Sequence, residues 1–251
     1  MTFAAAVKRV RIECAGGARF LKIRELCGED EESVADVDSL SAIDLLDRLL
    51  VAGRGADVEP GTAADLTISE RDFALAWVLI ATFGPLVRET VRCGQCSSKF
   101  DFELDVDALV RHRREGATSH LSSTLGFRLP TGMDELAVAG MAEADAERAL
   151  LARCGVADDA DVSAILGTME SAAPLLDAEL LAGCPECAAP NSVAFDVQSH
   201  LLGAIVRERT VRAHEIHRLT MGYGWSLTEI LRLSRSRRQT FNLLAAEHEP
   251  S

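Results

Sequence analysis

Two stretches of the sequence decide the fold, CGQCSSKFDFELDV at residues 93–106 and CPECAAPNSVAFDV at residues 184–197. Each begins with a C-x-x-C pair and continues into a segment in which apolar and polar residues alternate, the pattern of a half-buried strand. Two residues between cysteines permit a tight turn that directs both sulfur atoms at one ion, and structural zinc takes four such ligands at about 2.3 Å. The sequence therefore predicts a site for one structural zinc ion per chain. Its proposed ligands are Cys93, Cys96, Cys184 and Cys187.

The two pairs lie far apart in the sequence, whereas an uninterrupted zinc ribbon has about 15–20 residues between them. A strand follows each pair, and antiparallel pairing of these two strands would bring the two turns together. A redox role for the first pair is the alternative. A thioredoxin-type motif has a strand before it and a helix after it, because the helix N-terminus lowers the thiol pKa. Here a strand follows, which favours zinc, or a site that has lost its metal.

The other three cysteines are not expected to form a disulfide framework, because the total of seven is odd and the chain begins without a secretory signal pattern. We expect Cys14, Cys27 and Cys154 to be buried small apolar residues.

The composition indicates a globular protein of one or two domains, with 251 residues, of which 48% are hydrophobic and 26% charged. Its net charge of -13 disfavours binding to nucleic acid and to anionic membrane surfaces. The longest apolar run, residues 73–85, is shorter than the about 20 residues that cross a bilayer. We therefore expect a cytoplasmic protein without membrane insertion.

Apolar periodicity and turn residues predict an α+β fold that is mostly α-helical, in which a helical insertion interrupts a small four-cysteine, zinc-ribbon-like β unit. A β-hairpin is expected around Gly16 and Gly17, a helix after Ser39 or Ser41, and a helix over residues 73–83 capped by Ser69. The predicted segments are strands in 1–28, helices in 29–92, the split zinc-ribbon-like unit in 93–106 and 181–199, the helical insertion in 107–180, and a basic C-terminal helical domain in 200–251.

No constellation of residues points to catalysis, so we predict that the protein is not an enzyme and has no small-molecule substrate. The motif at residues 214–217, His-Glu-Ile-His, has its histidines at i and i+3, whereas zinc proteases need i and i+4. We interpret these histidines as structural residues of a partly exposed helix. Nucleotide-binding glycine loops and the serine hydrolase motif are missing from the sequence.

The C-terminal segment is the candidate partner-binding region. Residues 200–241 carry eight arginines against three glutamates, and a capping box from Ser226 to Glu229 predicts a helix after the Tyr223–Trp225 turn. We expect this turn to close a helix pair whose core comprises Ile216, Leu219, Ile230, Leu231 and Phe241. The residues proposed to contact a partner are Tyr223, Trp225, Arg232, Arg235, Arg237 and Arg238.

Several ordered motifs resemble the baseplate protein family of contractile-tailed bacteriophages, which includes a baseplate hub or assembly component of the T-even phages and relatives encoded with phage-derived contractile injection systems. The resemblance covers about residues 90–245 and is most specific in the C-terminal block, whereas the N-terminal third of the chain agrees only loosely. The motifs are FRLPTGMD at 127–134, LLARC at 150–154, CPEC at 184–187, HEIHRL at 214–219, YGWS at 223–226, EIL at 229–231, Arg237-Arg238, and the looser RELCG at 24–28.

The resemblance implies a non-enzymatic role in building or forming a baseplate, with other baseplate or tail proteins as partners. It implies a protein in the cytoplasm of the producing bacterium, either as an assembly factor or incorporated into the particle. The alternative is a zinc-ribbon, helix-turn-helix regulator that binds nucleic acid. It is considered because the order of helices and turns expected in residues 214–241 resembles a helix-turn-helix motif. The net charge of -13 disfavours this alternative.

Overall fold

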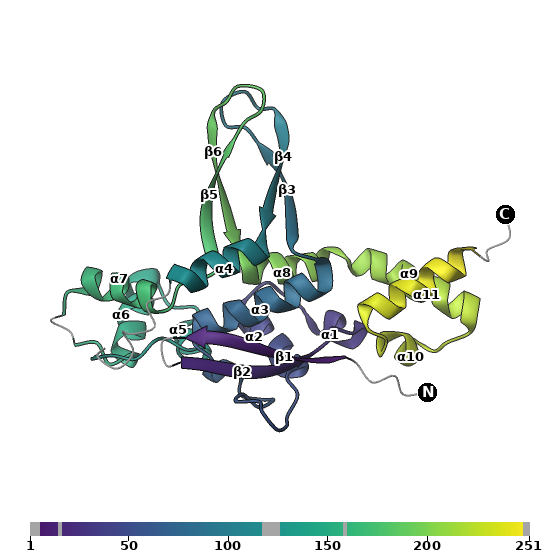
Figure 1. Ribbon diagram of the computed structural model, residues 1–251, viewed down its shortest axis with the longest axis horizontal. Coiled ribbons are helices and arrows are strands. Elements are labelled where there is room, and N and C mark those ends of the chain that lie inside the picture. Colours follow the sequence, from purple (N-terminus) through teal and green to yellow (C-terminus); the bar gives the residue numbers. More distant parts are fainter. Residues whose placement is uncertain (1–5, 15–16, 117–125, 158–159, 248–251) are drawn as a thin grey trace.

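The computed structural model describes residues 6–14, 17–116, 126–157 and 160–247. Helices contain 53% of the residues and strands 20%, all in small antiparallel sheets, which confirms the expected mainly helical α+β class. Two hairpins rise side by side from a layer of helices, while a third hairpin lies on the opposite side of that layer (Figure 1). Smaller helical groups flank the layer at both ends.

The N-terminal hairpin pairs β1 (Val7–Cys14) with β2 (Gly17–Arg24), as expected. Its four buried apolar residues alternate along the strands and face the helices: Val10, Ile12, Leu21 and Ile23. The sheet therefore covers one side of the main core.

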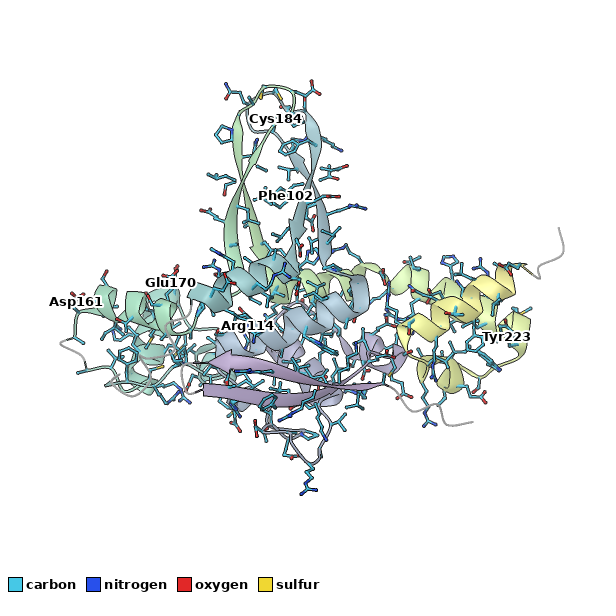
Figure 2. The ribbon with its side chains drawn as sticks, in the orientation of Figure 1. Phe102, Arg114, Asp161, Glu170, Cys184 and Tyr223 are labelled. Carbon is cyan, nitrogen blue, oxygen red and sulfur yellow. The ribbon has the colours of Figure 1, made fainter. Side chains whose placement is uncertain are left out.

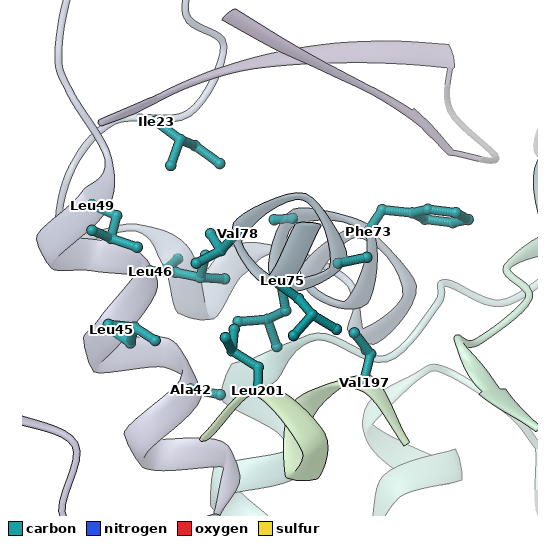
Figure 3. Close-up of a cluster of buried hydrophobic side chains, with 14 of the residues drawn as sticks. Ile23, Ala42, Leu45, Leu46, Leu49, Phe73, Leu75, Val78, Val197 and Leu201 are labelled. Carbon is teal, nitrogen blue, oxygen red and sulfur yellow. The ribbon is translucent and has the colours of Figure 1, made fainter. Parts of the chain in front are cut away.

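The main core is built around α3 (Ile68–Phe83), which packs against the N-terminal hairpin, α2 (Ser39–Leu49) and a later helix (Figure 3). Helix α3 begins five residues earlier than expected. Its N-cap is Thr67, whose side chain accepts a hydrogen bond from the Glu70 N–H, and a single 3-10 turn precedes it (Ala63–Asp65). Asp38 rather than a serine caps α2. Thr67 lies two residues before the expected Ser69, and Asp38 lies directly before Ser39, the nearer of the two serines expected to cap α2.

The two parallel-standing hairpins, here called the tower, are copies of one unit. Hairpin 1 consists of β3 (Leu86–Arg92) and β4 (Lys99–Asp105), and α4 (Val106–Gly116) follows it. Hairpin 2 consists of β5 (Asp177–Gly183) and β6 (Pro190–Asp196), and α8 (Val197–Arg207) follows it. Each strand and helix of the second copy begins and ends the same number of residues after its counterpart in the first. Cys184 follows Cys93 by that same number.

The pairing within the tower corrects one expectation. The strands that follow the two C-x-x-C pairs do not pair with each other; each pairs with a strand that precedes its own cysteines, β3 with β4 and β5 with β6. Each C-x-x-C is thus the turn of its own hairpin, and the hairpins begin at Leu86 and Asp177, before the predicted unit starts. The preceding strands alternate poorly in hydrophobicity, because Glu89 shares a face with Phe102 and because Leu180 and Leu181 are adjacent.

Between the two hairpins the chain is helical, as its periodicity predicted. The helices are α4, α5 (Gly132–Val138), α6 (Glu143–Arg153) and α7 (Val162–Ala172). The expected insertion also included residues 117–125 and 158–159, which lie outside the described part of the chain.

The starts of α1 (Gly28–Ser33) and α5 are built in the same way, a repetition that we did not expect. In both, a capping box links the residue before the helix to an aspartate three residues later, Asp30 in α1 and Asp134 in α5. An arginine six residues earlier binds that carboxylate with both of its terminal nitrogens: Arg24 in the first case and Arg128 in the second.

Each of these starts receives the first turn of another helix. The Leu26 carbonyl oxygen accepts the N–H of Arg235, and the Pro130 carbonyl oxygen accepts the N–H of Ile68, both at 3.2 Å. These donors are the first residues of α11 (Arg235–Glu247) and α3. The first residue of the receiving helix is glycine in both cases, and a Cβ on Gly28 would lie 2.8 Å from a side chain of the neighbouring α10 (Leu227–Leu231).

An ion pair completes both contacts; it is fully buried in the first, whereas in the second the glutamate is partly exposed. The glutamate after the capping aspartate binds the arginine at the fourth position of the incoming helix, which is Arg238 for Glu31 and Arg71 for Glu135. We call these two arrangements the helix-start contacts. The first joins α1 to α11, and the second joins α5 to α3.

Helices α9 (Arg209–Tyr223), α10 and α11 form a C-terminal unit at one end of the molecule (Figure 1). The capping box from Ser226 to Glu229 is present as predicted. No described residue of this unit belongs to the main apolar core, although Leu219 and Ile230 are fully buried within the unit. The unit is attached largely through polar contacts, in which Glu31 lies within ion-pair distance of three arginines: Arg212, Arg235 and Arg238.

Within the described ranges, no helix has both the length and the apolar character needed to cross a membrane.

Candidate metal centre

Both C-x-x-C turns have the same backbone geometry. In hairpin 1 the Cys93 N–H donates to the Ser98 carbonyl oxygen at 2.9 Å, and the Ser97 N–H donates to the Cys93 carbonyl oxygen at 3.0 Å. The same two bonds recur in hairpin 2 between Cys184 and residues 188–189. Ser97 has a φ of 62° and Ala188, at the same position of hairpin 2, has a φ of 58°. This is the left-handed conformation that such a turn needs after its second cysteine.

The four cysteines meet at the tip of the tower, where Figure 2 labels Cys184. All four sulfur atoms lie within 4.8 Å of one another. The Sγ–Sγ distance is 3.6 Å between Cys93 and Cys187 and 3.7 Å between Cys96 and Cys184. A tetrahedral ion with bonds of about 2.3 Å needs sulfur atoms about 3.8 Å apart, whereas a disulfide needs about 2.05 Å. The arrangement fits a four-thiolate metal site, and it contains ligands from both hairpins.

The surroundings of the thiols shift their pKa values in different directions. The N–H groups of Cys96 and Gln95 lower the pKa of the Cys93 thiol to about 6. The Ala189 N–H lowers the pKa of Cys187, but loss of hydration and the three neighbouring sulfur atoms raise it to about 12 overall. Four thiolates this close repel one another, so a divalent cation is the natural partner that allows all of them to lose their protons.

Few other contacts hold the tip together. Asn191 of β6 accepts the Gly94 N–H at 3.0 Å and donates to the Ala189 carbonyl oxygen at 2.9 Å, so it connects the two turns. Below it, Phe100 and Ala182 join the buried cysteines in a small apolar cluster that is separate from the main core. Sequence reasoning missed Asn191, although an amide at an inward-facing position of β6 was a usable signal. The metal site is therefore the largest potential link between the two tips.

The remaining cysteines are buried where they are described. Cys27 and Cys154 are both buried and unpaired, and burial raises the pKa of each thiol. The Cys27 thiol also donates to Asp30 at 3.1 Å within the cap of α1, so it is more than an apolar filler. The prediction for Cys14 concerns a side chain outside the described part.

The His-Glu-Ile-His motif on α9 has structural contacts. The Glu215 carboxylate is buried and accepts the Arg238 Nε–H at 2.8 Å. The ring of His214 lies 2.8 Å from the Thr210 carbonyl oxygen, one turn earlier on the helix. His214 and Glu215 therefore have structural contacts, whereas His217 lies on the exposed side of the helix.

The two aromatic residues of the proposed partner surface belong to one cluster. The rings of Tyr223 and Trp225 stack with their centroids 4.8 Å apart, and Phe241 of α11 meets Trp225 edge-on at 5.0 Å. Trp225 is half-buried, whereas the Tyr223 residue is 40% exposed. The cluster lies at the helix turn and leaves Tyr223 accessible. Of the predicted core, Leu219 and Ile230 are buried, whereas Ile216, Leu231 and Phe241 are partly exposed.

The structure corrects the proposal that all four arginines reach a partner. Arg238 is fully buried against Glu31 and Glu215, and Arg235 binds Glu208 with both terminal nitrogens. Both side chains therefore form ion pairs within the protein, at or beside the first helix-start contact. Arg232 remains exposed, with 73% of its side chain accessible, and Arg237 is exposed on α11.

No family model, no curated protein and no solved structure matches the chain.

Proposed function

We propose that the protein is a non-enzymatic structural or assembly component of a contractile phage tail or injection-system baseplate, acting through contacts with other baseplate or tail proteins. We further propose that its four-cysteine site holds one zinc ion with a structural role, because four thiolates in tetrahedral arrangement suit zinc and leave no position for a substrate.

One observation carries the proposal. The motifs that resemble the baseplate family are scattered over the sequence, yet four of them meet in the two helix-start contacts. Residues 24–28 and 127–134 form the receiving loops of the two contacts. Residues 214–219 and 237–238 supply Glu215 and Arg238, which join at the first contact. These motif residues fix the positions of helices, so the resemblance concerns the architecture of the chain, and the baseplate role is proposed from that resemblance.

The shape supports the same proposal. A projecting tower, a flanking helical group and the C-terminal unit present separate surfaces in different directions (Figure 1). An adaptor among several neighbours requires such surfaces. The chain's charge of -13 suits partners with basic surfaces, because complementary charge steers association.

The nucleic-acid-binding alternative is less well supported by the contacts of α11. A helix-turn-helix regulator presents basic side chains of its recognition helix to phosphates and bases. Here Arg235 and Arg238 face glutamates of the same chain, at Glu31 and Glu208 among others. Their charges are already compensated within the protein.

Two measurements on the full-length chain test the proposed function. The tagged chain, co-expressed with candidate baseplate proteins, is expected to retain at least one of them through purification, while the tag alone retains none. The purified chain is expected not to bind duplex DNA at physiological ionic strength. Sub-micromolar DNA binding that weakens steeply with salt, without recovery of a baseplate protein, would contradict the proposal and favour the regulator.

A further inference from the structure

The two hairpins of the tower are equal in length and register, so their faces can be compared position by position. The inward faces resemble each other, because both contribute apolar side chains to the cluster at the tip and to the main core. The outward faces, which point away from the other hairpin, differ sharply. That difference is where a function specific to one hairpin would appear.

The outward face of hairpin 1 is satisfied by its own side chains. Arg88 Nε donates to the Glu103 carboxylate at 2.5 Å across the strands. Next to this pair, the Thr90 hydroxyl donates to the Asp101 carboxylate at 3.0 Å. Cross-strand pairs of this kind stabilise a two-stranded sheet. In total, three basic side chains balance three acidic ones on this face: Arg88, Arg92 and Lys99 against Asp101, Glu103 and Asp105.

Hairpin 2 has neither of these two pairs at the equivalent positions. Glu179 lies opposite Ala194, which offers no group to a carboxylate, and Leu181 lies opposite Ser192. The Leu181 residue is 78% exposed, more than any other large hydrophobic residue of the described chain. Its side chain therefore lies in solvent on this face.

The base of the same face carries like charges. Asp177 lies directly opposite Asp196, and like charges in this position destabilise a strand pair. Asp196 also caps α8 by accepting the Ser199 N–H at 2.6 Å, whereas the Asp177 residue is exposed. Neither β5 nor β6 contains a basic residue. At the base of the face, Arg113 of α4 donates to the Asp177 carbonyl oxygen at 2.8 Å and leaves the Glu179 carboxylate, further up the strand, without a basic neighbour on the hairpin itself.

We propose that this outward face of hairpin 2 docks on a basic surface of a different protein. Leu181 enters an apolar pocket of the partner, and Glu179 and Asp177 pair with lysine or arginine side chains beside that pocket. The proposal deepens the proposed function, because it names one contact of the assembly protein and the chemistry of its partner.

A second copy of the chain does not fit this face. Two copies that met symmetrically through it would bring two acidic faces together, each with Glu179 and Asp177. The chain as a whole has a net charge of -13, and the buried arginines of its C-terminal unit already pair with glutamates. The charge of the face therefore favours a different, cationic partner.

The test uses the full-length zinc-loaded chain, immobilised, and a displayed library of random twelve-residue peptides as the probe. The test variant is Leu181→Ser with Glu179→Gln. The matched control carries Thr90→Ser with Arg88→Gln on the outward face of hairpin 1. All four positions are solvent-exposed, and both variants are required to keep the circular dichroism spectrum and metal content of the wild type.

We expect the selected peptides to combine lysine or arginine with an apolar side chain, and to bind more weakly as salt rises. Their affinity should fall by about tenfold or more in the test variant and by less than about twofold in the control. The proposal is overturned if no peptide is enriched, if the enriched peptides lack basic residues, or if they bind both variants equally. The library contains no baseplate protein, so these outcomes are independent of the co-purification that tests the proposed function.

Discussion

Cys93 and Cys187 are 94 positions apart in the sequence, yet their sulfur atoms lie 3.6 Å apart at the tip of the tower. The two residues belong to different copies of the same hairpin unit. Among the described residues, a small apolar cluster and the Asn191 contacts also join the two tips. A metal ion bound here would connect two halves of the chain that the main core joins only at the base of the tower.

Removal of the metal should loosen the tower and spare the rest of the fold. We expect a chelator to increase hydrogen exchange in residues 86–105 and 177–196, because a structural zinc site contributes on the order of 10 kcal/mol of binding free energy to the structure that forms it. The N-terminal hairpin β1–β2, which packs on the main core, is the internal control. Unchanged exchange in the tower, in a sample shown to have lost its metal, would contradict this role.

The carboxylate of Glu31 should hold the C-terminal unit in place. Glu31→Gln leaves Arg212, Arg235 and Arg238 without their shared counter-charge, and breaking a buried ion pair in this way typically costs about 3–5 kcal/mol. We expect a lower denaturant midpoint and easier proteolysis between α8 and α9.

The matched control for Glu31→Gln is Glu29→Gln on the same helix. Glu29 pairs with Arg232 at 3.4 Å, but both side chains are largely exposed, so the loss should be below about 1 kcal/mol. Equal effects of the two substitutions would show that the buried ion cluster does not hold the C-terminal unit.

The stacked aromatic turn should stabilise the C-terminal unit. Trp225→Ala removes ring contacts with Tyr223 and Phe241, and because Trp225 is half-buried we expect a loss of about 1–3 kcal/mol rather than the full cost of a buried tryptophan. Thermal melts beside Tyr223→Phe, which keeps the ring, measure the effect. An unchanged melt together with lost partner retention would identify Trp225 as an interface residue.

The carboxyl group of Asp72 should make stability depend on pH. Burial raises its pKa to about 7, although the Leu176 N–H, which it accepts at 3.0 Å, opposes the shift. A carboxyl group whose pKa is raised by folding stabilises the fold while protonated, so its contribution is full below about pH 4 and is lost as the pH rises through about 7. We expect the wild type to lose about 2–3 kcal/mol from this group between pH 5 and pH 8.

Asp72→Asn should remove that pH dependence, as measured by denaturant unfolding at both pH values. The control is Asp44→Asn, because the Asp44 side chain is half-exposed on α2. A wild-type pH slope that survives Asp72→Asn would assign the dependence to another group.

The sequence was sufficient to predict those features whose signals are local. The four-cysteine cluster, the N-terminal hairpin and the capping box from Ser226 to Glu229 were all expected, because each depends on spacing or on adjacent residues. The fold class followed from the same periodicity. The sequence stretch at 93–106 also predicted the strand β4 correctly, because its apolar residues alternate strictly.

The features that the sequence did not reveal depend on distant partners. The acidic run before α2 gave no indication that Glu31 is buried, because the arginines that compensate it come from α9 and α11. For the same reason Arg235 and Arg238 were assigned to a partner surface. The strands β3 and β5 were missed because their alternation is interrupted, and with them the fact that each cysteine pair forms its own hairpin turn.

The metal content of the purified protein tests the role of the four-cysteine site most directly. Elemental analysis and native mass spectrometry of protein prepared without added metal should show one zinc ion per chain, and X-ray absorption should show four sulfur ligands at about 2.3 Å. Cys187→Ser should lose the ion or bind it far more weakly, while Cys154→Ser, which changes a buried cysteine away from the tip, should keep it. Wild-type protein without metal, or a Cys187→Ser variant that retains it fully, would contradict the proposal that this ion joins the two hairpins.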